Sequence, residues 1–481
     1  MENQIYLRSI EKGNFSKKLI FKLSDDRTIE LIINSKKVDI TALSSFMHKR
    51  TNYPACCNEF EIIENVEQIG SMKLYENYIF LCNISGLLKT KNKIFFNNCI
   101  FTKKILINDL DKIESVSFNN SLFLMNISLS GKYDGEYETR VNFSNSEFIR
   151  GVHIFSNLKE IDLLNSCFRE ELGIYNNYEM VSTKKSFRLH NCHFIKSVFL
   201  KLGEINIDGP LPYHISDSIF YSEVDFRGSI FIDPIVFSRV EFKGSVNFAG
   251  VIFRQPVIFL YSKVYKNMIF RKTVFEKSLN LAYLYFLDDG CLDIYNINIK
   301  NFDSGKGLSW ENSSIFPNYK NTNQIKTKEI ISDQDAKETY RILKKEALKQ
   351  SDTISAIEFY KQECEKYYKS ISKIRNFGNK FVLFFEKIVS NYGTSIIRSI
   401  LSLIIFNFYY YLLVQLFINQ GDLNYSMVSI LNGVMGVMLP HVLGGYDISY
   451  IPITSRSLHI IINAILLYEV IKSFRKYSRK L

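Results

Sequence analysis

Phenylalanine recurs through the middle of this chain at steps that alternate between five and six residues. Two steps therefore add up to 11 residues and four steps to 22. A fixed internal period is typical of a chain that coils and stacks one large apolar side chain on the next. The sequence therefore predicts a solenoid. The recurring positions are Phe220, Phe226, Phe231, Phe237, Phe242, Phe248, Phe253 and Phe259, then Val264 in place of Phe, and then Phe270 and Phe275.

The same pattern extends upstream in short segments that end in Phe and carry Ser or Cys two places earlier. One large and one small inward residue, alternating with outward polar residues, suit short β-strands. The Asn, Asp and Gly residues between them tolerate the backbone conformation of corners. Five residues form one side of a coil, and four sides enclose a core. Cys99 and Cys192 occupy the small inward position, so we interpret them as buried spacers rather than reactive thiols. The segments are Asn97–Phe101, Asn119–Phe123, Ser144–Phe148, Leu164–Phe168, His190–Phe194 and Ser216–Phe220.

These segments resemble the pentapeptide-repeat family, in which a central Leu or Phe and a small residue two places earlier recur every five residues. The resemblance covers roughly residues 56–316 and implies a right-handed four-sided β-helix. The extra residue in every second step departs from the family's regular five. Some members of the family mimic DNA and bind gyrase, but those members are acidic. Residues 1–320 carry 39 basic and 36 acidic groups, so we expect no DNA mimicry and no nucleic-acid partner.

Composition and periodicity divide the chain into five segments. Alternating stretches in residues 1–55 predict a small N-terminal β cap, and residues 56–320 form the predicted β-helix. Helical spacing over residues 321–376 predicts a hairpin connector. Residues 377–395 combine an aromatic stripe with lysines, which beside an apolar span predicts an amphipathic interfacial helix; a core helix has a similar pattern. Residues 396–481 are expected to form a transmembrane pore-like domain, so the fold is mainly β with a two-span α-helical membrane domain.

Two long apolar runs support the membrane prediction. Ser399–Gln420 has 22 uncharged residues, which is long enough to cross a bilayer core. Ser457–Phe474 is a second run. Residues 321–481 carry 21 basic and 13 acidic groups, and so hold most of the net charge of +11. The basic groups flank the spans, and the positive-inside rule then places both termini in the cytoplasm. With no signal peptide expected, we predict a protein of the bacterial inner membrane.

The stretch between the two runs, residues 421–456, is almost uncharged and rich in Gly. Because both ends are expected on one side, this stretch has to enter and leave the bilayer on the other. Non-helical backbone at that depth is tolerated only when it is buried in protein or lines water. A re-entrant helix over roughly residues 424–439, ended by Pro440, meets this demand in an oligomer.

Span, re-entrant helix and span is the plan of a two-transmembrane pore-loop channel. This order of parts, with Ser390-Asn391-Tyr392-Gly393-Thr394-Ser395 before the first span, resembles bacterial pentapeptide-repeat proteins that carry a C-terminal ion-channel-like domain. The resemblance implies a homo-oligomer, a tetramer by analogy. The TVGYG potassium filter is absent, so potassium selectivity is not inferred. The candidate pore-lining residues are Pro440, His441, Gly444, Gly445, Asn463 and Glu469.

Two of these candidates also have a structural interpretation. Asn463 and Asn407 are polar residues within the spans, and such residues often only join one helix to another. Glu469 lies three residues before Lys472 and would then be a paired carboxylate at the membrane interface. The sequence leaves both interpretations open.

The chain shows no Walker loop, no GxSxG, no HExxH and no paired Cys/His site. We therefore expect no enzymatic activity, no metal and no cofactor. The leading hypothesis is a membrane-anchored oligomeric pore that is regulated by the cytoplasmic β-helix. The alternative is a scaffold without a pore, tethered to the lipid bilayer, which binds a protein partner through the β-helix or acts as a membrane-directed defence effector. In a third interpretation, the protein is soluble and the apolar runs are core helices.

Overall fold

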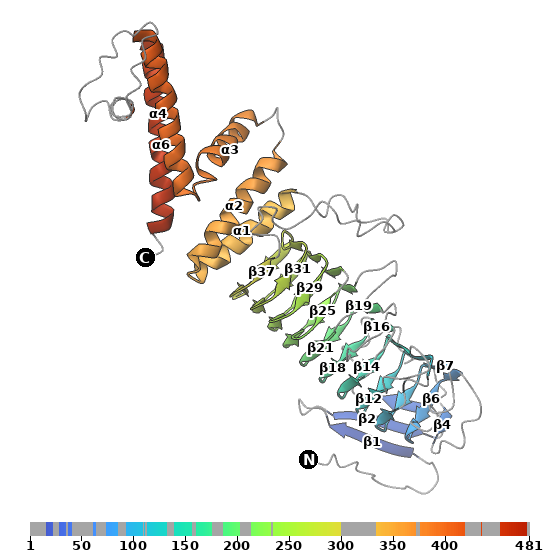
Figure 1. Cartoon of the computed structure of the whole chain (residues 1–481). Coiled ribbons are helices and arrows are strands. Elements are labelled where there is room, and N and C mark those ends of the chain that lie inside the picture. Colours follow the sequence, from blue (N-terminus) through green and yellow to red (C-terminus); the bar gives the residue numbers. More distant parts are fainter. Residues whose placement is uncertain are drawn as a thin grey trace. The chain divides into compact units, whose positions relative to one another are not determined.

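The structure is a computed structural model, and its chain forms two compact units, Met1–Ile330 and Ile331–Leu481. Figure 1 shows the elements of both units. The described residues are 16–22, 28–34, 37–40, 61–63, 74–84, 93–108, 110, 113–131, 139–155, 160–175, 186–202, 213–231, 234–299, 333–371, 376–418, 434 and 453–478.

The first unit is a β-solenoid. Its described strands form four parallel sheets of 10, 11, 9 and 4 strands, and each strand is bonded to its counterparts in the turns before and after it. The first sheet contains β5 Leu74–Glu76, β7 Lys93–Asn97, β10 Ser115–Asn119, β13 Arg140–Ser144, β16 Glu160–Leu164, β19 Ser186–His190, β22 Tyr213–Ser216, β26 Ile235–Ser238, β30 Val257–Leu260 and β34 Leu279–Asn280. The second contains β4 Glu61–Ile63, β6 Tyr78–Phe80, β8 Ile100–Phe101, β11 Leu122–Phe123, β14 Glu147–Phe148, β17 Cys167–Phe168, β20 His193–Phe194, β23 Ile219–Phe220, β27 Glu241–Phe242, β31 Ser262–Val264 and β35 Leu284–Phe286.

The other two parallel sheets are shorter. The third contains β9 Ile105–Ile107, β12 Ile127–Ser130, β15 Val152–Phe155, β18 Leu172–Tyr175, β21 Val198–Lys201, β24 Val224–Asp225, β28 Val246–Asn247, β32 Asn267–Ile269 and β36 Cys291–Asp293. The fourth contains β25 Ile230–Phe231, β29 Ile252–Phe253, β33 Val274–Phe275 and β37 Asn298–Ile299. The predicted end of the repeats near Phe316 lies outside the described residues.

The register of the strands explains why the spacing of the Phe residues alternates between five and six residues. Phe237 lies opposite Phe259, so one turn takes 22 residues where no insertion interrupts it. Within that turn the large inward residues are Phe237, Phe242, Phe248 and Phe253, all fully buried. The predicted solenoid is confirmed. The alternating step of five and six residues is the separation along the sequence between successive inward residues of one turn.

The inward rings stack along the solenoid. In the second sheet the ring centroids of Phe101, Phe123, Phe148 and Phe168 follow one another at 4.8, 4.7 and 4.5 Å, with nearly parallel planes. These separations match the spacing of neighbouring strands, about 4.8 Å. Each buried Phe contributes about 1.5–3 kcal/mol by leaving water, so the columns hold consecutive turns together.

The polar residues of the repeat close its corners. Asn residues at equivalent corners adopt the left-handed conformation, with φ of 55° at Asn98, 50° at Asn165 and 51° at Asn191. Asn is one of the few residue types that tolerate this conformation. The Asn191 amide also donates to Oδ1 of Asn165 at 3.0 Å, which links one turn to the next. The corner preference inferred from the sequence is confirmed.

The small inward residue has its own hydrogen-bonding task. Ser146 Oγ accepts the backbone N–H of Ser121 in the preceding turn at 3.2 Å and lies 2.9 Å from the carbonyl oxygen of Ser144. Cys99 and Cys192 occupy the same position and are buried, as predicted.

A three-stranded antiparallel sheet precedes the solenoid in the chain. It consists of β1 Ser16–Lys22, β2 Thr28–Asn34 and β3 Lys37–Ile40. β1 and β2 pair from Ser16 with Asn34 to Lys22 with Thr28, which is the hairpin expected from their alternating pattern. The rest of residues 1–55 lies outside the described residues.

The second unit is helical. Its described helices are α1 Asp333–Lys349, α2 Thr353–Ser370, α3 Phe377–Ser390, α4 Ile396–Ile418 and α6 Ile453–Ser478. α1 and α2 pack together as the predicted helical hairpin, with Tyr340, Leu343 and Phe359 in its core. The hairpin turns at Ser351, which has a φ of 59°, and the Asp352 carboxylate caps α2 by accepting the N–H of Ser355 at 3.0 Å.

Candidate functional site

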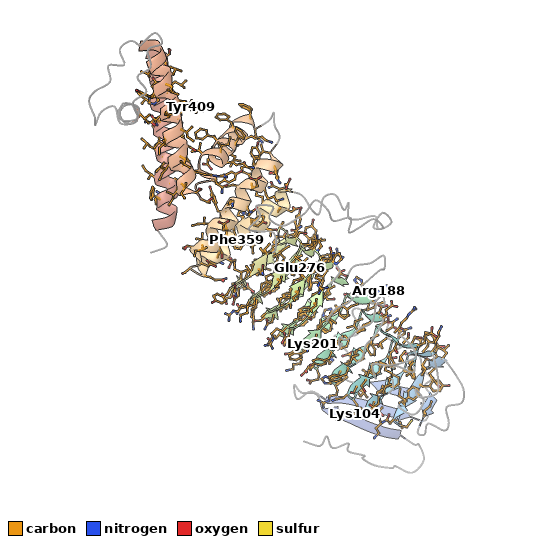
Figure 2. All side chains as sticks on the ribbon, in the orientation of Figure 1. Lys104, Arg188, Lys201, Glu276, Phe359 and Tyr409 are labelled. Carbon is orange, nitrogen blue, oxygen red and sulfur yellow. The ribbon has the colours of Figure 1, made fainter. Side chains whose placement is uncertain are left out.

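α4 and α6 lie side by side and are long and apolar enough to cross a membrane, by length and composition. The apolar windows are Ile396–Val414 and Ser457–Arg475, of which 22% and 28% are buried within the structure. Most of both helices therefore faces outward. Figure 2 shows the side chains on this pair, with Tyr409 labelled on α4.

The outward surface of this pair is apolar. Two-thirds of the Tyr409 side chain is exposed, and several aliphatic side chains are about half exposed. In water such a surface would be costly, because each large apolar side chain contributes about 1.5–3 kcal/mol when it is buried. The exposed large residues are Ile397, Leu401, Ile404, Ile405, Phe408, Tyr409 and Leu413 on α4, and Leu458, Ile460, Ile461, Ile465, Tyr468, Ile471 and Phe474 on α6.

The polar residues of the two helices face each other instead. Asn407 Nδ2 donates to Oδ1 of Asn463 at 2.9 Å and to the carbonyl oxygen of Leu403 at 2.8 Å. Nε2 of His459 lies 3.1 Å from Oδ1 of Asn407, and the imidazole stacks on the ring of Tyr410 with centroids 3.8 Å apart. The contact between α4 and α6 therefore contains a polar seam, with apolar surface around it.

The seam continues toward the start of α4 and the end of α6. Ser399 Oγ and Ser473 Oγ are 2.9 Å apart. Ser390, the last residue of α3, donates from Oγ to Oε2 of Glu469 at 2.6 Å, and both side chains are buried. Lys472 Nζ lies 3.2 Å from Oε1 of Glu469. The interpretation of Glu469 as a paired carboxylate is confirmed.

α3 is held at this end of the seam. Lys472 Nζ donates to Oε1 of Glu386 on α3 at 2.6 Å, so one ammonium group bridges two carboxylates. Val389 of α3 belongs to the same buried apolar cluster as Leu403 of α4 and Leu466 of α6. α3 is thus fixed to both helices by an ionic bridge and by apolar packing.

The opposite side of α3 is tied to α2. Lys387 Nζ donates to Oε1 of Glu365 at 2.9 Å, and the Tyr392 hydroxyl donates to Oε2 of Glu365 at 3.0 Å. Burial favours the neutral form of Glu365, but the hydrogen bond and charge of Lys387 outweigh it and hold its pKa below the usual range. Burial, together with the Glu365 carboxylate, raises the pKa of Tyr392.

The Ser390–Ser395 motif forms the turn between α3 and α4. Asn391, Tyr392 and Gly393 follow one another with φ of 49°, 60° and 70°. For a residue with a Cβ such a conformation costs about 1–2 kcal/mol. The turn is stabilised by Ser390 Oγ, which accepts the N–H of Gly393 at 2.7 Å. The motif therefore has a structural role in reversing the chain.

The predicted pore-lining residues fall into two groups. Pro440, His441, Gly444 and Gly445 lie outside the described residues, as do residues 419–433 and 435–452, which hold nearly all of the predicted re-entrant helix. Asn463 and Glu469 are buried in the seam between α4 and α6. Sequence reasoning did not identify the partnership of Glu386 with Lys472 or of Ser390 with Glu469. These pairs are 86 and 79 residues apart in the chain, and no local spacing signals them.

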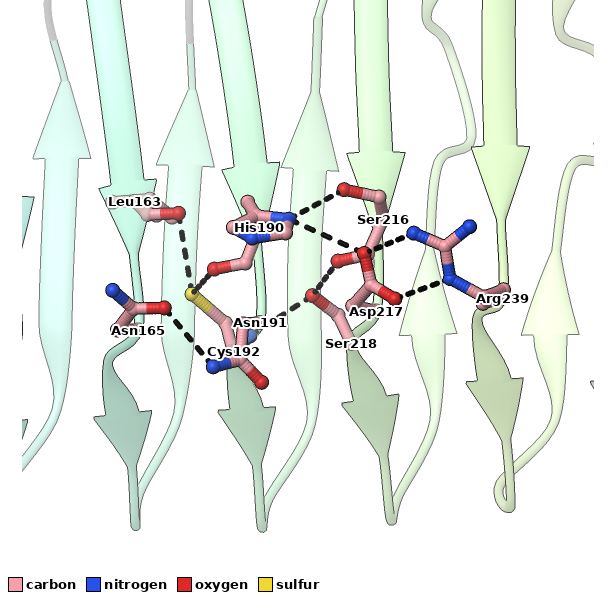
Figure 3. Close-up of polar contacts among 9 residues, drawn as sticks. All are labelled: Leu163, Asn165, His190, Asn191, Cys192, Ser216, Asp217, Ser218 and Arg239. Atoms are coloured by element: carbon pink, nitrogen blue, oxygen red, sulfur yellow. Dashed lines mark hydrogen bonds and ion pairs between the residues drawn. The ribbon is translucent and has the colours of Figure 1, made fainter. Parts of the chain in front are cut away.

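The solenoid carries a second polar cluster, shown in Figure 3. His190 Nδ1 lies 2.7 Å from Ser216 Oγ and 3.4 Å from Oδ2 of Asp217, whose carboxylate also pairs with Arg239 at 2.5 and 2.8 Å. Both contacts of the histidine use the same nitrogen, so the group is not arranged as a nucleophile, base and orienting acid. Burial raises the pKa of the neighbouring Cys192 thiol to about 12, which favours the neutral thiol.

Among the described residues, no group of three or more His, Cys, Asp or Glu side chains could hold a metal ion. Comparisons with protein-family models, with curated proteins and with solved structures find no match to this chain.

Proposed function

We propose that this chain is anchored in a membrane by the helices α4 and α6. The observation that carries the proposal is their inverted polarity: the hydrogen-bonding side chains Asn407, His459 and Asn463 are turned inward, whereas the apolar side chains are exposed. In lipid this arrangement leaves the polar groups satisfied and the apolar groups solvated by acyl chains. In water the hydrogen bonds would persist, but the exposed apolar side chains would be costly.

We infer further that the solenoid is a right-handed four-sided β-helix of the pentapeptide-repeat type. The recurrence of Ser or Cys two places before Phe in the six repeat segments, and the stacking of parallel strands, support this class. The basic residues in the last turns of α6 and after it support a bacterial inner-membrane protein with both termini in the cytoplasm. The solenoid would then lie on the cytoplasmic side.

The leading function is an ion-channel-like pore in a homo-oligomer, with the tetramer as the analogy, regulated by the solenoid. The almost uncharged, Gly-rich segment between α4 and α6 supports this proposal, because an ordinary external loop has no need of such a composition. Asn463 and Glu469 are engaged within the seam of one subunit. In this proposal Pro440, His441 and the Gly444-Gly445 pair line the pore in the resting state, and the two seam residues reach it only if α4 and α6 separate.

The alternative is a membrane-tethered scaffold without a pore, which includes the membrane-directed defence effector. Its solenoid would bind a protein partner, and α4 and α6 would serve only as an anchor. The apolar outer surfaces of α4 and α6 favour this alternative, because the described residues of these two helices present no polar face toward a channel. Both proposals are for a protein without catalytic activity, cofactor or nucleic-acid partner.

Two experiments test these proposals in order. The full-length protein should stay in the membrane pellet after extraction at alkaline pH, and its release would refute anchoring. In planar bilayers the purified protein should conduct ions, and Gly436→Asp should abolish conductance. Gly421→Asp, beside the natural Asp422, is the matched control and should still conduct. Membrane retention without conductance in the unmodified protein would leave the scaffold as the function.

A further inference from the structure

α3 carries a row of exposed apolar side chains along one face. Phe377, Phe381, Phe384 and Ile388 follow at spacings of four, three and four residues, which places them in one stripe along a helix. Their side chains are 69%, 56%, 46% and 57% exposed. We call these four residues the α3 stripe. A stripe of three Phe and one Ile is unusual on a protein surface that faces water.

Away from the α3 stripe, α3 is held by contacts with three helices. Glu386 and Ser390 bond to Lys472 and Glu469 of α6. The carbonyl oxygen of Val389 accepts from Ser402 of α4 at 3.2 Å. On the side of α2, Lys380 and Lys387 place their ammonium groups 5.0 and 5.6 Å from the centre of the Tyr368 ring. Because α3 is held on these sides, it has little freedom to rotate and bury the stripe.

The contacts also fix the position of α3 along the length of α4 and α6. Glu469 lies six residues before Arg475, the end of the apolar window of α6. At about 1.5 Å per residue, the end of α3 lies about 9 Å inside that window. Amphipathic helices bury their apolar face about 5–10 Å into the boundary between headgroups and acyl chains. The basic residues Arg398, near the start of α4, and Arg475, near the end of α6, lie between this level and the nearer ends of the two helices. Anionic headgroups would meet them there.

We infer that α3, which the sequence predicts to be an interfacial helix, is held by α4 and α6 at a depth where lipid covers its stripe at the headgroup–acyl boundary. The inference rests on the proposed membrane anchoring, and it adds a second lipid-binding element fixed at a definite depth. The bridge of Glu386, Lys472 and Glu469 sets that depth, because it joins α3 directly to the membrane-spanning helix α6. α2, which is bonded to α3, is thereby brought to the membrane surface.

Three single-tryptophan proteins test the inference. Trp310, the one tryptophan of the chain, is replaced by Phe, and Phe384→Trp, Tyr409→Trp or Tyr295→Trp is introduced. All three sites are exposed aromatic residues, on α3, on α4 and on the solenoid. Each full-length protein is reconstituted in phosphatidylcholine–phosphatidylglycerol vesicles in which the phosphatidylcholine is brominated either near the headgroup or deep in the acyl chain.

The tryptophan at 384 should lose most of its fluorescence to the shallow bromines and less to the deep ones. The tryptophan at 409 should be quenched as a marker of the span, and the tryptophan at 295 should not be quenched. Quenching at 409 without quenching at 384 would overturn the inference and leave the anchoring intact; a blue-shifted emission at 384 would then indicate that protein covers the stripe. Absence of quenching at both sites would refute the anchoring as well.

Discussion

Phe95 and Phe96 on β7 form a natural matched pair, because they are the same residue type on opposite faces of one strand. Phe96 is fully buried, and its ring lies 5.1 Å from that of Tyr75 and 5.0 Å from that of Phe118 in parallel stacks. Two further rings meet it edge-on at 5.7 and 5.2 Å. Phe95 points outward and is 40% exposed. Only the inward ring contributes to the column.

We expect Phe96→Ala to destabilise the surrounding turns by about 5 kcal/mol. Replacement of a buried Phe by Ala costs about 3–5 kcal/mol, and the four ring contacts, worth about 0.5–1.5 kcal/mol each, favour the upper end. Phe95→Ala should cost about 0.5 kcal/mol, as is usual at an exposed site. Both changes remove the same atoms. The large difference between the two destabilisations is therefore the prediction.

Hydrogen–deuterium exchange on the full-length protein can measure both effects locally. A solenoid opens turn by turn, so the amides of β5, β7 and β10 report the change without global unfolding. Exchange there should accelerate about a thousandfold or more for Phe96→Ala, since about 1.4 kcal/mol is a factor of ten, and by less than about threefold for Phe95→Ala. Where Phe96→Ala fails to fold, Phe96→Leu should give an intermediate effect of about 1.5 kcal/mol. Equal effects of the two alanine variants would refute the column as the source of stability.

Three further predictions concern polar contacts. Ser146→Ala removes the acceptor of the buried Ser121 N–H and should cost about 1–3 kcal/mol, seen as faster exchange of that amide; unchanged exchange would contradict the role of the small inward residue. Lys472→Met leaves the two carboxylates that it bridges without their cation and should cost about 3–5 kcal/mol, measured as a lower Tm in detergent, and an unchanged Tm would argue against the bridge. Because the pKa of Glu365 is held below its usual range, its ionisation stabilises the fold above the ordinary carboxyl pKa, and this contribution is lost as the pH falls through the lowered value. Lys387→Gln should therefore raise the pH of acid unfolding, whereas the same pH midpoint in both proteins would count against the pair.

The solenoid was predictable from the sequence because its information is local and repeated. The alternation of inward Phe with a small residue two places earlier recurs often enough that one pattern fixes strand, corner and turn length. The helical hairpin of α1 and α2 was predictable for a related reason, since helical spacing with a break at Asp352 is also local. Insertions change the interval between turns, but the register of Phe118 with Phe143 shows that they leave the columns in place.

The seam was predictable only in part. The spacing of Glu469 and Lys472 indicated a pair, and the two asparagines indicated a contact between helices. The roles of Glu386 and Ser390 were not visible, because their partners come from helices far away in the chain and are chosen by how α3 packs. The exposed stripe of α3 illustrates the same limit, since its amphipathic pattern alone fits a core helix as well as an interfacial one.

The sequence by itself determined that this chain coils, that the coil takes 22 residues per uninterrupted turn, and that two apolar helices follow. Periodicity and hydrophobic length are properties of consecutive residues, and they act before any distant contact forms. Only the tertiary structure decided which way the polar residues of α4 and α6 face and which side of α3 stays uncovered. Those outcomes depend on the pairing of Asn407 with Asn463 and of Lys472 with Glu386, because a helix can turn any face inward until a partner selects one.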